Sequence, residues 1–161
     1  MDTGLDGVVA AVTNLSQVDG EAGRLIVRGH DIEELAADYD FADMAALLWD
    51  GLVPGDQSST AIRRALGQAR RRAAEKLPHL LPAARGLSAI EGLRAGLAML
   101  ADDECDHVLL CAAVPVFTAA LWRQGQGKGP VAPDPAKGQA EDFLAMLTDG
   151  AADQASSRAL E

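Results

Sequence analysis

The sequence predicts a mainly α-helical protein that begins with a short β-hairpin, and three observations carry this prediction. Aromatic residues make up only 4% of the chain, whereas Ala and Leu are abundant, and such small aliphatic side chains favour close helix packing. From residue 40 onward, apolar residues recur at the three- and four-residue spacing of an amphipathic helix. Before residue 30, two β-forming runs at 8–18 and 24–29 flank a turn of Asp and Gly residues at 19–23.

The hairpin passes directly into the first helix. The glycines of the turn supply the positive φ that a short connection needs, and Gly29 ends the second strand. Asp31 then suits the N-cap position, because its carboxylate can accept backbone N–H groups of the first helical turn. Arg28, His30 and Asp31 could form a catalytic loop, but the capping role already explains Asp31 and favours a structural interpretation.

Capping signals and apolar stripes predict the further helices. Asp40 occupies an N-cap position, and Ser88 and Glu91 form a capping box. Pro78 and Pro82 bracket a short connector. The helical segments are expected at residues 40–51, 58–77, 88–100, 108–124, 139–147 and 153–161.

Charge and composition exclude several classes of protein. The chain has 161 residues and a net charge of −10, so its surface repels nucleic acid on average. We interpret the basic run at 70–72 as a solvated helix face. Cys105 and Cys111 do not make a disulfide scaffold or a metal site. The N-terminus shows no secretory signal, and the apolar run at 108–122 is shorter than the ~20 residues that cross a bilayer. A cytoplasmic protein with no membrane contact is expected.

The sequence contains no recognisable catalytic motif. It has no Gly-rich phosphate loop, no H-E-x-x-H and no nucleophile elbow. His30, His79 and His107 stand apart near the ends of expected elements, where a solvated or capping imidazole is the ordinary role. We therefore assign no catalytic, cofactor-binding or metal-ligating residue and expect no cofactor.

The segment 108–124 is apolar on nearly every side and is interrupted by Pro115. A helix of this kind must be covered all round, and the chain has few other helices to cover it. Part of the cover is therefore expected to come from another polypeptide.

Several segments resemble the citrate synthase family of the bacterial type. Residues 4–36 are similar to the N-terminal hairpin and first helix of that family, and FADMAALLWDGLVP at 41–54 resembles its next helix. AIEGLRAGLAML at 89–100 resembles the segment usually written Pro-Met-x-x-Leu-Arg, with Ala-Ile in place of Pro-Met. Residues 114–147 resemble the long central helix, a loop ending in Pro-Asp-Pro and the helix after it. The resemblance implies that residues 1–161 are the N-terminal portion of a citrate synthase-like large domain, with a hairpin at 1–29 and helices at 30–161.

The resemblance also implies an activity. The family condenses an acyl-CoA with a 2-oxo acid such as oxaloacetate, a Claisen-type reaction of tricarboxylic acid metabolism. An aspartate removes a proton from the acetyl-CoA methyl group, histidines stabilise the enol and polarise the ketone, and arginines bind the carboxylates. In the family these groups follow the segment that resembles residues 158–161, so no catalytic residue can be carried over. His30 falls where the family often has Tyr, which favours a structural role.

Three interpretations stay open. The chain is a non-catalytic small subunit of a split citrate synthase-like enzyme, a regulatory or interaction module, or a truncated fragment without activity. In the family, the helices that resemble 88–101 and 108–124 lie at the subunit interface. The expected partner is therefore a complementary subunit that carries the catalytic residues, or a second copy in a homodimer, and acyl-CoA and oxo acid are bound only via the partner. The expected interface residues are Leu93, Leu97, Leu110, Val114, Phe117 and Leu121, and replacement of Phe117 or Leu121 by Asp is expected to abolish assembly.

Overall fold

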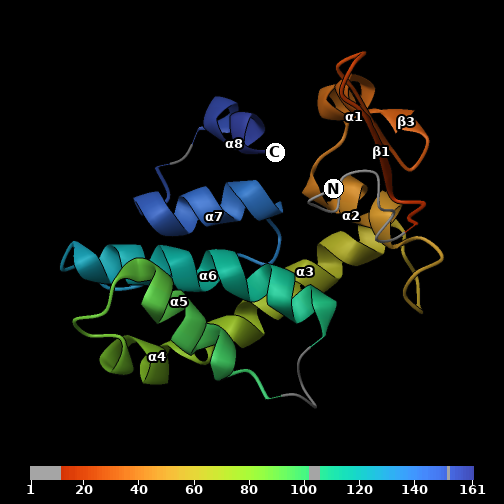
Figure 1. Ribbon diagram of the computed structural model, residues 1–161. Helices are drawn as coiled ribbons and strands as arrows, with labels where there is room; N and C mark the ends of the chain where they lie inside the picture. The colour runs from red at the N-terminus through yellow and green to blue at the C-terminus, as the bar shows by residue number, and fades with distance from the viewer. Residues whose placement is uncertain (1–11, 102–105, 152) are drawn as a thin grey trace, which may run out of the picture. The chain divides into compact units, whose positions relative to one another are not determined.

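The protein is described by a computed structural model over residues 12–101, 106–151 and 153–161. Its backbone divides into two compact units, residues 1–38 and residues 39–161, which are drawn in Figure 1. The mainly α-helical fold with an N-terminal hairpin is confirmed. The boundary between the two units falls after Asp38, and the first helix packs on the strands.

The described part of the first unit, residues 12–38, contains three short antiparallel strands and one helix. The strands are β1 (Ser16–Asp19), β2 (Arg24–Val27) and β3 (His30–Asp31), in the order β1-β2-β3, and the helix is α1 (Ile32–Asp38). The predicted turn at 19–23 is confirmed, since β1 ends and β2 begins on either side of it. The predicted first strand was longer: residues 8–11 lie outside the described residues, and 12–15 are not in a strand. The two-residue β3 was not predicted.

The sharp turn after β2 explains the residues that follow it. Arg28 and Gly29 both have positive φ, 50° and 88°, and this turns the chain back so that His30 pairs with Val27. Asp31 Oδ1 accepts a hydrogen bond from the Glu33 amide at 3.1 Å, which confirms the predicted helix-capping role.

Seven helices are described in the second unit, and the longest of them is at its centre. They are α2 (Phe41–Trp49), α3 (Ser59–Ala74), α4 (Leu77–Ala83), α5 (Ala89–Ala98), α6 (His107–Gly125), α7 (Gln139–Thr148) and α8 (Gln154–Leu160). In Figure 1, α7 lies along one side of α6, while α5 and α4 lie on the opposite side. α3 also packs against α6, and the core residues of these helices form one cluster.

The capping predictions are confirmed, and one helix was missed. Asp40 and Ser88 each form a capping box at the start of α2 and α5. Residues 78–82, expected as a connector, belong to α4. A helix forms there because Pro78 lies in the first turn, where no N–H is needed, and because Leu77 and Leu80 are buried on one side.

Two glycines bring α5 unusually close to α6. A Cβ added at Gly92 would lie 2.8 Å from a methyl group of Leu121, and one added at Gly96 would lie 2.8 Å from the Phe117 ring. The side chains of α6 therefore fill the space that the glycines leave open. Phe117 is fully buried and Leu121 is 8% exposed within this single chain.

Candidate functional site

A buried ion pair joins α3 to α7. Arg70 Nε donates to Asp142 Oδ2 at 2.6 Å, and each side chain is only 1% exposed. The guanidinium also donates to the Lys137 carbonyl at 2.7 Å, and Asp142 Oδ1 accepts from the Asp134 amide at 2.9 Å. Burial raises the pKa of the Asp142 carboxyl above its ordinary value, and the Asp134 amide and the Arg70 guanidinium offset part of that rise. The pair thus fixes the loop that precedes α7.

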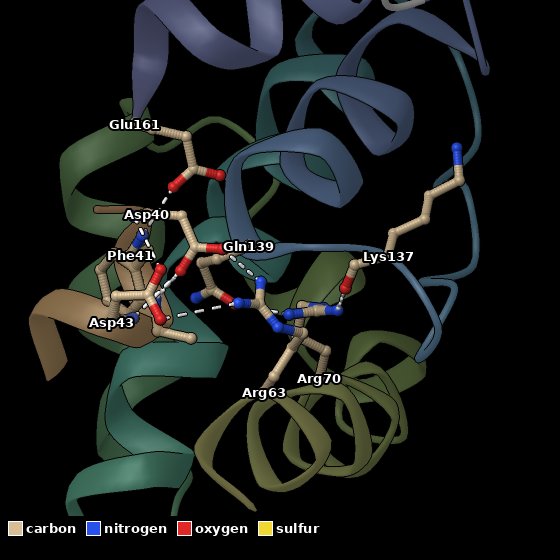
Figure 2. A network of polar contacts seen from close by, with 9 residues as sticks. Asp40, Phe41, Asp43, Arg63, Arg70, Lys137, Gln139 and Glu161 are labelled. Atoms are coloured by element: carbon tan, nitrogen blue, oxygen red, sulfur yellow. Dashed lines mark hydrogen bonds and ion pairs between the residues drawn. The ribbon is translucent and has the colours of Figure 1, made fainter. Parts of the chain in front are cut away.

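Gln139 extends this network to a defect in α6. Pro115 has no N–H, so the carbonyl of Cys111, four residues earlier, lacks its helical partner. Gln139 Nε2 donates to that carbonyl at 2.8 Å, while its Oε1 accepts from Arg70 Nη1 at 2.6 Å. One amide side chain therefore satisfies a helix defect on one side and a buried guanidinium on the other. Figure 2 shows Gln139 beside Arg70.

A second polar network joins α2, α3 and the C-terminal residue. Arg63 forms an ion pair with Asp40, and Glu161 Oε2 accepts a hydrogen bond from the Phe41 amide at 2.7 Å (Figure 2). Burial alone would raise the pKa of Asp40, but Arg63 and the amide of Asp43 hold it below its ordinary value. These charged groups bind one another, an arrangement typical of structural networks.

An apolar groove lies beside these networks on the surface of the second unit. It has a volume of about 350 Å³ and is lined by Phe41, Cys111, Val114, Pro115, Gln139, Ala140, Phe143, Leu160 and Glu161. Three of its walls carry unusually exposed apolar side chains: Phe41 is 38% exposed, Val114 40% and Leu160 51%. Leu110, one turn before Val114 on α6, is 42% exposed and extends the same helix face. Contiguous exposed apolar surface of this kind is typical of interaction sites.

The six residues predicted to form an interface differ in how exposed they are in the structure. Leu110 and Val114 are exposed, and Leu93 and Leu97 are half-buried against the core. Phe117 and Leu121 both pack on α5 inside this chain and present almost no surface, and their place at an interface stays a prediction. Asp at either position would therefore damage the fold itself, so these substitutions cannot report on an interface.

The candidate histidines remain at the ends of elements. His30 and His79 are exposed, and His107 begins α6 with its ring edge-on to Trp49 at a centroid distance of 4.6 Å. Within residues 12–101, 106–151 and 153–161, no group of three or more His, Cys, Asp or Glu side chains could hold a metal ion. Burial raises the pKa of the Cys111 thiol, which disfavours the reactive thiolate. Cys105 lies outside the described residues.

One described helix, α6, is long and apolar enough to cross a membrane by length and composition. Half of its most apolar window is buried, because α3, α4, α5 and α7 all pack against it. The core helix of a folded domain has the same properties, in agreement with the role predicted from its length.

The sequence analysis missed a deeply buried arginine. Arg70 was expected on a solvated face with its two neighbours, yet it is 1% exposed. The sequence carries a signal, since Arg70 falls four residues after Leu66 on the apolar stripe of its own helix. Its partner Asp142 lies 72 residues away and has no local signature.

Comparison with known proteins identifies the fold. A sequence model of the family described as "Citrate synthase, C-terminal domain" matches residues 4–161. The chain belongs to the citrate synthase family. The predicted resemblance is confirmed.

Relatives of this citrate synthase-family chain are more than twice its length. The citrate/2-methylcitrate synthase of Bacillus subtilis is 30% identical over 159 residues, which cover 90% of this chain and 42% of the relative. The citrate synthase of Haloferax volcanii is 32% identical over 164 residues, covering 89% of this chain and 42% of the relative. The crystal structure of citrate synthase from Thermotoga maritima superimposes with a TM-score of 0.83 and 27% identity, over 100% of this chain and 44% of that one. The chain thus spans less than half the length of the relatives it matches.

Proposed function

We propose that this chain is the non-catalytic part of a citrate synthase-like enzyme whose catalytic residues lie on a complementary polypeptide. The combination of two observations supports this proposal. The chain matches less than half of each relative, and its helical unit leaves an apolar groove exposed beside α6. Its role is to complete the helical scaffold around the site that the complementary chain supplies.

The reaction proposed for the assembly is the condensation of an acyl-CoA with a 2-oxo acid. Relatives of this chain are named citrate synthase and 2-methylcitrate synthase, so acetyl-CoA and propionyl-CoA are the acyl donors to test. The reaction needs a base that removes a proton next to a thioester carbonyl and donors that stabilise the resulting enolate. The charged side chains of the two networks described above are engaged with one another, which supports a structural rather than a catalytic role for this chain.

The purified chain is tested with acetyl-CoA or propionyl-CoA and oxaloacetate, with CoA release followed by a thiol-reactive dye. We expect no release above a blank that lacks oxaloacetate. Addition of a citrate synthase-like partner from the same cell is expected to give release that depends on both chains. Turnover by a partner-free preparation contradicts a non-catalytic role. A partner with equal activity with and without this chain contradicts the need for completion and favours a dispensable module or fragment.

A further inference from the structure

We infer that the apolar groove formed by α2, α6, α7 and α8 is the docking site for an amphipathic helix of the complementary citrate synthase-like chain. This inference rests on the proposed function and adds to it the surface and the kind of element that binds there. The groove is one of several depressions on the second unit, and three observations distinguish it.

The lining of the groove fits side chains of a helix better than a small ligand. Its two polar side chains are already engaged: Gln139 binds the Cys111 carbonyl and Arg70, and Glu161 accepts from the Phe41 amide. A ligand site keeps a few polar groups in place to orient its ligand. A groove with apolar walls and satisfied polar groups instead matches the helix-in-groove mode of recognition, in which apolar residues at i, i+3, i+4 and i+7 enter the groove.

The exposed side chains continue the groove along α6. Val114 lies in the groove and Leu110 lies one turn before it, so both project from the same side of the helix. Phe41 from α2 and Leu160 from α8 line the groove with them. An approaching helix could therefore contact side chains from several elements, as is usual where a helix packs into a folded domain.

Charge favours a different chain over a second copy. Each copy carries a net charge of −10, so association of two copies brings like charges together. Glu161 at the groove adds a local negative group. The partner helix is therefore expected to carry an apolar stripe flanked by Lys or Arg. More than half of the Thermotoga maritima chain lies outside the part that this chain matches, so a complementary chain of this family has enough length to supply a helix.

The test places a charge in the groove and asks whether the partner is lost. Val114→Asp and Phe41→Asp each introduce a carboxylate at an exposed groove position, on two different helices. Both should fold, because the charge reaches water in the free chain, and an acid in the first turn of α2 also suits the helix dipole. Trp122→Asp is the matched control, since Trp122 is on α6 and 55% exposed but does not line the groove.

The tagged chain and its three variants are expressed in the native host, cross-linked and purified, and the recovered proteins are identified by mass spectrometry. Circular dichroism and urea midpoints confirm that each variant is folded. We expect a citrate synthase-like polypeptide with the wild type and Trp122→Asp, and about tenfold less or none with Val114→Asp and Phe41→Asp.

The outcomes separate the two proposals. Equal recovery of the citrate synthase-like partner with all four proteins overturns the groove as the docking site and leaves the proposed function in place. Recovery of only the tagged chain and its own copies overturns the proposed function, and the docking inference with it. If the partner is lost only with Trp122→Asp and not with the two groove variants, the interface lies at the other end of α6, and the inference is overturned.

Discussion

Removal of the Arg70 guanidinium is expected to destabilise the chain strongly. In Arg70→Leu, the Asp142 carboxylate stays 1% exposed without its cation, and the Lys137 carbonyl and the Gln139 amide oxygen also lose a donor. Removing one member of a buried ion pair costs about 3–5 kcal/mol, and each buried acceptor left unpaired adds to that cost. We expect a loss of about 4 kcal/mol in the free energy of unfolding, a large share of the ~5–15 kcal/mol of a typical domain.

Urea unfolding followed by circular dichroism measures this loss, and two control variants isolate its cause. Arg71→Leu changes the exposed neighbouring residue and should alter stability by no more than about 0.5 kcal/mol. The double variant Arg70→Leu/Asp142→Leu removes both charges and should recover at least half of the single variant's loss. Equal effects of Arg70→Leu and Arg71→Leu, or no recovery in the double variant, would refute the reasoning.

The pH dependence of the single variant provides an independent check. Burial already raises the pKa of Asp142, and loss of Arg70 removes an interaction that opposes this rise. A carboxyl whose pKa is higher in the folded than in the unfolded state stabilises the fold at low pH and loses that contribution as pH rises through the folded pKa. The penalty of Arg70→Leu should therefore shrink as the solution is acidified from pH 7 toward pH 4. A penalty that grows on acidification contradicts a buried unpaired carboxylate.

Three further predictions concern other parts of the chain. Gly67→Ala would place a Cβ 2.3 Å from a backbone carbonyl oxygen of the loop before α7. Thermal melts should therefore show a net loss of about 1–2 kcal/mol in the free energy of unfolding, although Ala has the better helix propensity. In the control Gly125→Ala, the added Cβ has no neighbour within 4 Å, and the variant should be as stable as the wild type or more stable. The lowered pKa of Asp40 means that its pair with Arg63 stabilises the fold above the unfolded value of 3.8 and is lost as pH falls below it. The urea-midpoint difference between wild type and Asp40→Asn should therefore be small at pH 7, because the side chains of Arg63 and Asp40 are 41% and 30% exposed, and should shrink as the solution is acidified below the unfolded pKa. His30→Ala should cost about 1 kcal/mol or less and leave recovery of the partner unchanged; loss of assembled activity in a folded, assembled variant would reopen a catalytic role.

Local chemistry made much of the fold predictable. Helix starts at Asp40 and Ser88 follow from side chains that bind the first-turn amides a few residues away, so the signal is contained in a short stretch. The α4 helix was missed because its two prolines were taken as breakers, whereas one of them lies in the first turn. Burial of leucines on one side decided the outcome, and burial depends on residues far away in the sequence.

The candidate site was less predictable because its contacts are long-range. The exposed groove combines residues from α2, α6, α7 and α8, which periodicity alone cannot bring together. The inference that α6 needs cover on all sides stays a prediction, because Leu110, Val114 and Trp122 are exposed in this chain, and it did not identify what covers each side. Gly92 and Gly96, four residues apart, point to a close helix contact, and this pattern could have indicated that Phe117 and Leu121 are covered from within.

The hydrogen bond that Gln139 donates to the Cys111 carbonyl has a mechanical consequence. Because this carbonyl is the one left open by Pro115, the bond favours one position of α7 along α6, and a slide of either helix by one turn would break it and leave the carbonyl unsatisfied. The same bond holds together the floor of the groove that the two helices share, so this floor is already formed in the free chain. A partner helix that docks there avoids the entropic cost of ordering its receptor, so the strength of the complex depends on the fit of the incoming surface.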